Sequence, residues 1–91
     1  MKARWHIYFS GRVQGVGFRY RAELMARSLY LTGWVKNLWD GRVEMEVQGD
    51  LSQIRKFLIQ LRAQPYIRIE HMEIQDDLPL VKESAFEIAG Y

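Results

Sequence analysis

The feature that most constrains this chain is a change in the spacing of its apolar residues after the first dozen positions. Trp5, Ile7 and Phe9 alternate with more polar neighbours, which is the two-residue period of a β-strand with one buried face. From position 18 the spacing becomes that of a single helical face, carried by Phe18, Ala22, Met25, Ala26 and Leu29. We therefore expect a strand over residues 4–12 and a helix over residues 18–30.

Two further strands are expected at residues 32–37 and 42–48. They are joined around Asp40-Gly41, a dipeptide that readily adopts the positive φ angles of a tight hairpin. In the second of these strands every other residue is apolar and is expected to face inward: Val43, Met45 and Val47.

A second helix is expected to begin at Asp50, because Asp50 and Gln53 have the spacing of a capping pair. Pro65 lies just beyond its expected end. The buried face of this helix is expected to comprise Leu51, Ile54, Leu58 and Leu61.

The strand after this helix changes the face on which its apolar residues fall. They lie on one face before His71 and on the other face after it: Ile67 and Ile69, then Met72 and Ile74. We therefore expect a β-bulge or a twist near His71. A charged surface loop over residues 76–84 then leads to a short last strand that contains Phe86 and Ile88.

The resulting order, β-α-β-β-α-β with an extra short C-terminal strand, predicts an α+β fold of the ferredoxin-like α/β sandwich type. Two helices would pack on one face of a mainly antiparallel sheet with strand order 4-1-3-2. The 91 residues, 48% of them hydrophobic, suffice for one core, so we expect a single domain over residues 1–91. This fold hosts many functions and selects none of them.

The composition narrows the chemistry. The chain has no cysteine, which excludes disulfides and thiolate nucleophiles and favours a cytoplasmic location. We expect no signal peptide and no membrane-spanning segment. Residues 1–37 contain seven Lys or Arg but only one acid, whereas the remainder is net acidic. The N-terminal part is therefore a candidate for binding an anion.

The segment between the first strand and the first helix carries three glycines and two arginines in ten residues, Ser10 to Arg19. Alternating glycines allow successive main-chain N–H groups to point into one anion-binding hollow. The following helix has no Ser, Thr, Asp or Asn at its start, so a phosphate could accept hydrogen bonds from its free N–H groups. Arg19 lies in its first turn and could bind phosphate oxygens in a bidentate manner.

Two familiar phosphate loops do not fit this segment. A P-loop ends in Gly-Lys followed by Ser or Thr, and the dinucleotide fingerprint has a third glycine where this chain has Tyr20. From the residues alone, a plain connecting turn with a solvated Arg19 remains an alternative.

The run Gly11-Arg12-Val13-Gln14-Gly15-Val16-Gly17-Phe18-Arg19 resembles the signature loop of the acylphosphatase family. The similarity extends to a second block and to the closing strand, so that it spans nearly the whole chain. The matching residues are Gly33-Trp34-Val35-Lys36-Asn37, then Asp40-Gly41-Arg42-Val43-Glu44, and finally Phe86-Glu87-Ile88.

This resemblance implies an enzyme, an acylphosphate phosphohydrolase that cleaves the carboxyl-phosphate bond of acyl phosphates. It implies that Arg19 and Asn37 are catalytic, with Asn37 orienting the attacking water. It further implies that the main chain from Gly11 to Arg19 forms a phosphate cradle, in which the binding residues are Gly15, Val16, Gly17, Phe18 and Arg19. Acyl phosphate and phosphate are then the expected partners, and we expect a monomer that binds neither nucleic acid nor membrane.

The chain departs from the family pattern at two places. The family usually has glycine just after the first helix, where this chain has Tyr30, and a Gly-Pro pair where it has Gln64-Pro65. A left-handed tyrosine would cost about 1 kcal/mol or more, so we expect the turn at Tyr30 to have a different shape.

We expect no metal and no other cofactor, because the acid nearest to the loop in sequence is Glu23, one turn into the helix. His6 and His71 are interpreted as ordinary strand residues rather than as a pair for covalent catalysis.

Two other functions share this fold. A non-catalytic domain that binds phosphate or carbamoyl phosphate, like those fused within larger maturation proteins, would keep the same motifs. An RNA-recognition module would need aromatic residues on its central strands, whereas the expected outward face here is Glu44, Glu46 and Gln48.

Overall fold

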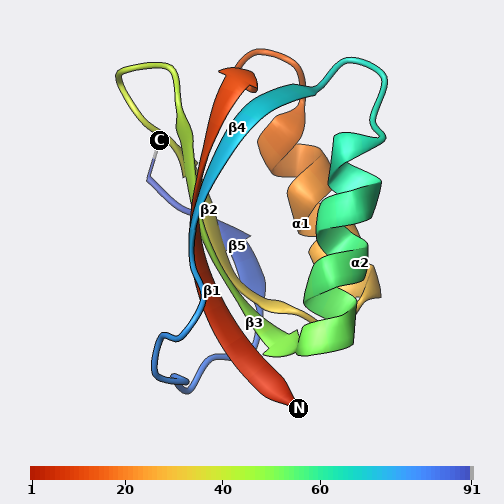
Figure 1. The fold of residues 1–91 in the computed structure, drawn as a ribbon, viewed down its shortest axis with the longest axis vertical. Coiled ribbons are helices and arrows are strands. Elements are labelled where there is room, and N and C mark those ends of the chain that lie inside the picture. Colours follow the sequence, from red (N-terminus) through yellow and green to blue (C-terminus); the bar gives the residue numbers. More distant parts are fainter. Residues whose placement is uncertain (91) are drawn as a thin grey trace.

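A computed structural model describes residues 1–90 of the chain. No helix in this part of the chain is both long and apolar enough to cross a membrane. The elements follow the expected order (Figure 1): β1 Lys2–Arg12, α1 Phe18–Ser28, β2 Thr32–Asn37, β3 Val43–Asp50, α2 Leu51–Arg62, β4 Arg68–Gln75 and β5 Phe86–Ile88.

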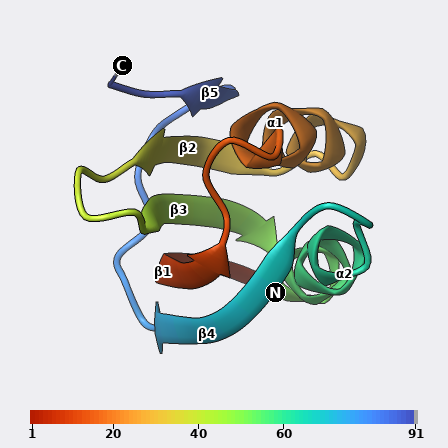
Figure 2. The ribbon, with the colours of Figure 1, turned by 90° about the horizontal axis from the view of Figure 1, so that it is seen from above.

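The strands form one sheet in the order β4-β1-β3-β2-β5. The pairs β1–β4, β1–β3 and β2–β3 are antiparallel, and β5 adds to β2 in parallel. The predicted 4-1-3-2 order is therefore confirmed, with the short last strand placed at the edge beside β2. Both helices lie on the same face of the sheet (Figure 2), which gives the expected ferredoxin-like α+β fold.

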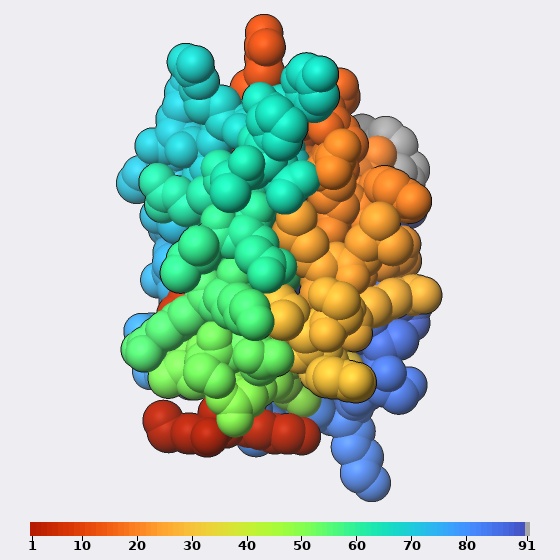
Figure 3. Space-filling model, turned by 90° about the vertical axis from the view of Figure 1, so that its right-hand side faces the viewer, coloured from red at the N-terminus to blue at the C-terminus, as the bar shows by residue number. Residues whose placement is uncertain are grey.

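The core lies between the helices and one face of the sheet. Figure 3 shows α1 and α2 side by side over this face. Ile7 and Phe9 of β1 are fully buried, as are the three apolar residues predicted for β3. Phe57 also belongs to the buried face of α2, whereas Leu51 is only half-buried because it begins the helix at the rim of the core.

The start of α2 is set by Asp50, as expected. Its carboxylate accepts hydrogen bonds from the N–H of Ser52 at 3.0 Å and from the hydroxyl of Ser52 at 2.7 Å. The capping contact is thus made with Ser52 rather than with Gln53. This arrangement provides an acceptor for one of the unpaired N–H groups in the first turn.

The irregularity predicted near His71 is a β-bulge. Ser10 pairs with His71 but the next residue, Gly11, pairs with Ile69, so Glu70 is the extra residue on β4. The bulge lies where β1 ends and the glycine-rich loop begins, and it allows apolar residues on both sides of it to face the helices.

The expectation for Tyr30 was wrong. Tyr30 adopts the left-handed conformation itself, with φ 59°. The N–H of Leu31 donates to the carbonyl of Ala26 at 2.8 Å and the N–H of Tyr30 donates to that of Arg27 at 3.2 Å, which is the Schellman ending of a helix. The turn returns Leu31 to the core while Tyr30 stays 89% exposed, so tertiary packing outweighs the local strain.

Candidate active site

The glycine-rich loop joins β1 to α1 at the end of the sheet where β1 stops. Gly15 and Gly17 have φ angles of 72° and 79°, in the left-handed region that glycine enters without steric cost. Gly17 caps α1 without any side-chain hydrogen bond, and the first turn of α1 contains no acidic residue. The first N–H groups of the helix are therefore available to an anion.

The space above the loop is open on the side of Gly15. A Cβ atom built on Gly15 would meet no atom within 4 Å, and one on Gly17 would only reach Nε of Arg21 at 4.0 Å. Glycine is thus required at these positions by backbone conformation and not by crowding. A ligand could approach the main chain closely here.

A cavity of about 240 Å³ lies between the loop, the first turn of α1 and the ends of β2 and β5. It brings together Arg19 and Asn37, the two residues implied to be catalytic. The lining residues are Val13, Gly15, Gly17, Phe18, Arg19, Tyr20, Asn37 and Ile88. The two motifs of the sequence therefore meet in one site.

Asn37 reaches the cavity because it is the last residue of β2. It lies two positions after Val35, which is fully buried under the helices, so both side chains leave the same face of the strand. Its main chain pairs with Val43 of β3. The side-chain Oδ1 is buried and accepts no hydrogen bond within residues 1–90.

Gln14 fixes the loop against the hairpin that carries Asn37. Its side-chain Nε2 donates to the carbonyl oxygen of Leu38 at 2.7 Å and to that of Arg42 at 2.9 Å. These two residues form the neck of the hairpin, where the N–H of Leu38 donates to the carbonyl of Arg42 at 2.8 Å. Sequence reasoning assigned Gln14 no role, although it is the one polar non-glycine residue between Arg12 and Phe18.

The hairpin turn is stabilised by contacts between Asp40 and Arg42. The carboxylate of Asp40 accepts hydrogen bonds from the N–H of Arg42 at 3.1 Å and from Nε of Arg42 at 2.9 Å. The main-chain hydrogen bond first, and then the guanidinium contact, lower the pKa of Asp40 below its ordinary value. The carboxylate therefore stays ionised at neutral pH and holds the turn that follows Asn37.

Tyr20 and Ile88 line the cavity and were not predicted, whereas Val13 lies within the expected phosphate-binding segment 11–19 but was not named as a binding residue. Ile88 could have been found, because it shares a strand face with the fully buried Phe86. Nothing in the local sequence marks Tyr20. Val16, by contrast, packs its side chain against the core instead of lining the cavity.

The histidines lie on strands, as interpreted from the sequence. Nε2 of His6 lies 2.8 Å from a carboxylate oxygen of Glu44, and His71 is exposed on β4. Within residues 1–90, no group of three or more His, Asp or Glu side chains is arranged to hold a metal ion.

Comparison with known proteins extends the similarity over the whole site. The model of the acylphosphatase family matches residues 5–88. An acylphosphatase of Roseiflexus sp. (strain RS-1) is 40% identical over 87 residues, which is 94% of either chain. The crystal structure of acylphosphatase from Bacillus subtilis superposes with a TM-score of 0.90 at 33% identity, covering 99% of this chain and 100% of that one.

The same fold also occurs inside a larger protein. The structure of HypF from T. kodakarensis matches with a TM-score of 0.81 at 36% identity, over 97% of this chain but only 12% of that one. The acylphosphatases of Roseiflexus sp. and Bacillus subtilis, however, match over 94% and 100% of their length. The chain therefore belongs to the acylphosphatase family, hydrolases that convert acyl phosphates into a carboxylate and inorganic phosphate.

Proposed function

We propose that this hydrolysis takes place in the cavity between the glycine-rich loop and Asn37. Main-chain N–H groups of Gly15, Val16, Gly17 and Phe18, together with the guanidinium of Arg19, would hold the phosphoryl group. Asn37 would orient the attacking water. The observation that supports these roles is the cavity itself, which places Arg19 and Asn37 around one space.

The chemistry requires few groups. The leaving group is a carboxylate whose conjugate acid has a pKa of about 4, so no general acid is needed at neutral pH. The phosphoryl group passes through a loose transition state with charge spread over its oxygens. Preorganised N–H donors and a guanidinium stabilise that charge, and we propose that they do so without a metal.

The geometry of Asn37 suits the orientation of water. A buried acceptor without a donor costs about 1–3 kcal/mol, and Oδ1 of Asn37 is such an acceptor within the described residues. A water that donates to this oxygen would gain a fixed position beside the loop. Because Asn37 ends a paired strand, its backbone is held in a fixed position.

We further propose that the chain acts as a monomer in the cytoplasm, on small acyl phosphates and not on nucleic acid. The absence of cysteine from the sequence supports this location. The outward face of β3 carries Glu44 and Glu46, and not the aromatic side chains on which RNA bases stack in a recognition module. A non-catalytic phosphate-binding domain is the alternative, and turnover of benzoyl phosphate separates the two directly.

Two substitutions test the assigned roles, because they should have different effects on phosphate affinity and on turnover. Arg19→Gln removes a charged contact to the phosphoryl group, so we expect phosphate affinity to fall and turnover to drop by about a thousandfold. Asn37→Ala leaves the loop intact, so phosphate should bind nearly as before while turnover falls by at least about a hundredfold.

The matched control for Arg19→Gln is Arg27→Gln, which removes the same charge from the exposed last turn of α1. Circular dichroism and melting must first show that each variant is folded. A folded Asn37→Ala protein with normal turnover, or a folded Arg19→Gln protein that binds phosphate like the parent, would contradict the assignment.

A further inference from the structure

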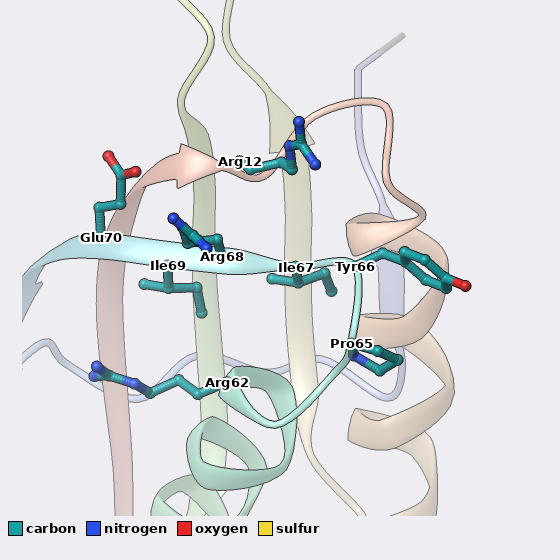
Figure 4. Close-up of a pocket in the computed structure, with 8 residues that line it drawn as sticks. All are labelled: Arg12, Arg62, Pro65, Tyr66, Ile67, Arg68, Ile69 and Glu70. Atoms are coloured by element: carbon teal, nitrogen blue, oxygen red, sulfur yellow. The ribbon is translucent and has the colours of Figure 1, made fainter.

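A second cavity, of about 680 Å³, lies around the start of β4, beside the residue from which the glycine-rich loop begins (Figure 4). Three arginines from different elements line it: Arg12 at the end of β1, Arg62 at the end of α2 and Arg68 at the start of β4. The remaining lining residues are Pro65, Tyr66, Ile67, Ile69 and Glu70. Arg12 and Arg68 are register partners in the β1–β4 ladder, so their side chains start from adjacent strands.

No carboxylate of the described residues forms an ion pair with an arginine of this cavity, that is, with Arg12, Arg62 or Arg68. Glu70 is the one acid among the described residues that line the cavity, and it takes part in none of the ion pairs between described residues. Three guanidiniums around one cavity attract an anion.

The arginine cavity adjoins the proposed phosphate site through the loop. Arg12 lines the arginine cavity and the next residue, Val13, lines the phosphate cavity. Figure 3 shows the segment after β1 and the segment around the end of α2 meeting at the same end of the molecule. A ligand could therefore extend from one cavity to the other across the start of the loop.

The direction of the reaction points toward this cavity. In an in-line displacement the attacking water and the leaving oxygen lie on opposite sides of phosphorus. In the proposed arrangement Asn37 holds the water at the end of β2, and the sheet order puts β1 and β4 on the other side of β3. If the proposed roles hold, the acyl group departs toward β1 and β4, where the arginines lie.

We propose that Arg12, Arg62 and Arg68 form a subsite for the acyl group, and that the enzyme favours acyl phosphates whose acyl group carries a second anion. This inference rests on the proposed placement of phosphate and water. In Figure 4 Arg62 lies on one side of β4, and Arg12 and Arg68 lie on the other. A carboxylate or a phosphate on the acyl group would therefore be bound by Arg62 or by the other two arginines, and attracted by all three. The arginines would then determine specificity without taking part in bond cleavage.

The test compares rigid substrates that differ only in this anion. Benzoyl phosphate carries none, whereas 4-carboxybenzoyl phosphate and 4-phosphonobenzoyl phosphate carry one opposite the reacting group. The 3-substituted isomers sample a second direction. We expect kcat/KM at low ionic strength to be about three to ten times higher for an anionic substrate than for benzoyl phosphate, mainly through KM, and to lose this advantage in salt.

The specificity ratio is kcat/KM for the anionic substrate divided by kcat/KM for benzoyl phosphate. Substitutions of the arginines and of Glu70 should change this ratio in opposite directions. Arg62→Gln and Arg68→Gln should each lower it, and together bring it near one, while leaving benzoyl phosphate turnover unchanged. Glu70→Gln should raise it. The control Arg55→Gln removes the same charge from an exposed position of α2 that lines neither cavity, and should leave the ratio at the parent value.

The outcomes distinguish this proposal from the hydrolysis mechanism. Turnover of benzoyl phosphate reports the mechanism, and the ratio of the two substrates reports the arginine subsite. A parent ratio near one with every isomer would overturn the subsite. So would a ratio that Arg62→Gln, Arg68→Gln and Arg55→Gln all reduce equally, because that result reports net charge alone. A larger gain with the phosphonate than with the carboxylate would identify a phosphate as the preferred second anion.

Discussion

Nε2 of Gln14 donates a hydrogen bond of 2.7 Å to the carbonyl oxygen of Leu38, the residue that follows Asn37 in the chain. A second hydrogen bond of 2.9 Å joins the same nitrogen to the carbonyl of Arg42. One side chain thereby connects the loop proposed to hold phosphate with the hairpin that carries the proposed water-orienting residue. The separation between phosphorus and water would depend on this connection.

Replacing Gln14 by methionine should therefore lower catalysis more than stability. We expect kcat to fall by about tenfold, since small displacements of reacting groups cost this much or more. Melting should change little, because both carbonyls keep a main-chain donor: Gly41 donates to Leu38 at 3.2 Å and Leu38 donates to Arg42 at 2.8 Å. Steady-state kinetics with benzoyl phosphate checks this, with Gln75→Met on exposed β4 as control. A folded Gln14→Met enzyme with parental kcat would show that the bridge does not position the site.

The glycines and the apolar spacing made much of the fold predictable. The change from two-residue to helical spacing places β1 and α1, and the slip of apolar residues around His71 predicts the bulge at Glu70. These features are local in sequence. The conformation of Tyr30 was not predictable from local preference, because the need to bury Leu31 decides it.

The candidate site was predictable only in part for the same reason. Arg19 and Asn37 lie in two motifs whose resemblance to one family places them together. The bridge from Gln14, the contribution of Ile88 and the arginine cavity all depend on contacts between distant segments. Such contacts have no spacing pattern in the sequence, so only the folded chain reveals them.

Inorganic phosphate should stabilise the folded chain. If the loop and Arg19 bind phosphate, the melting temperature should rise with phosphate concentration, because a ligand that binds only the native state adds RT ln(1 + [L]/Kd) to stability. Scanning fluorimetry with phosphate measures the shift, and sodium chloride at matched ionic strength is the control. Arg19→Gln should reduce the shift. An equal shift in that variant would indicate general salting effects instead of the proposed site.

Catalysis should not depend on a divalent metal. The leaving carboxylate needs no Lewis acid, and the described residues that line the site supply N–H groups and a guanidinium but no carboxylate. Turnover of benzoyl phosphate should persist after dialysis against excess EDTA and stay unchanged when magnesium is added. A rate that collapses with EDTA and returns with a metal would refute this expectation.

Tyr30→Gly should stabilise the chain. Tyr30 holds a left-handed conformation that costs about 1–2 kcal/mol for a residue other than glycine, and its side chain is 89% exposed. Part of the gain is offset by the greater freedom of glycine in the unfolded chain, so we expect about 1 kcal/mol and a melting temperature higher by about 4–8 °C. Tyr30→Ala, which keeps the strain and loses the ring, should show no such gain. Activity should be unaffected by either change.

The last prediction concerns the pH dependence of the cap on α2. The pKa of Asp50 is lowered by hydrogen bonds from the side chain and then the N–H of Ser52, and by the N-terminal ammonium 3.4 Å away. A carboxyl whose pKa is lower in the folded than in the unfolded state stabilises the fold above its unfolded pKa, which is about 3.9. That contribution is lost as the pH falls through the folded pKa.

Asp50→Ala should therefore melt several degrees below the parent at pH 7, because α2 loses its cap. This difference in melting temperature between the parent and Asp50→Ala should narrow as the pH is lowered from about 5 toward 2. Asp50→Asn is the matched control, since asparagine caps a helix about as well as aspartate but does not titrate. The difference in melting temperature between Asp50→Asn and Asp50→Ala should stay constant over this pH range, because neither side chain changes charge. If the difference between the parent and Asp50→Ala is equally constant, the ionised carboxylate contributes nothing beyond a neutral cap, and the lowered pKa has no consequence for folding.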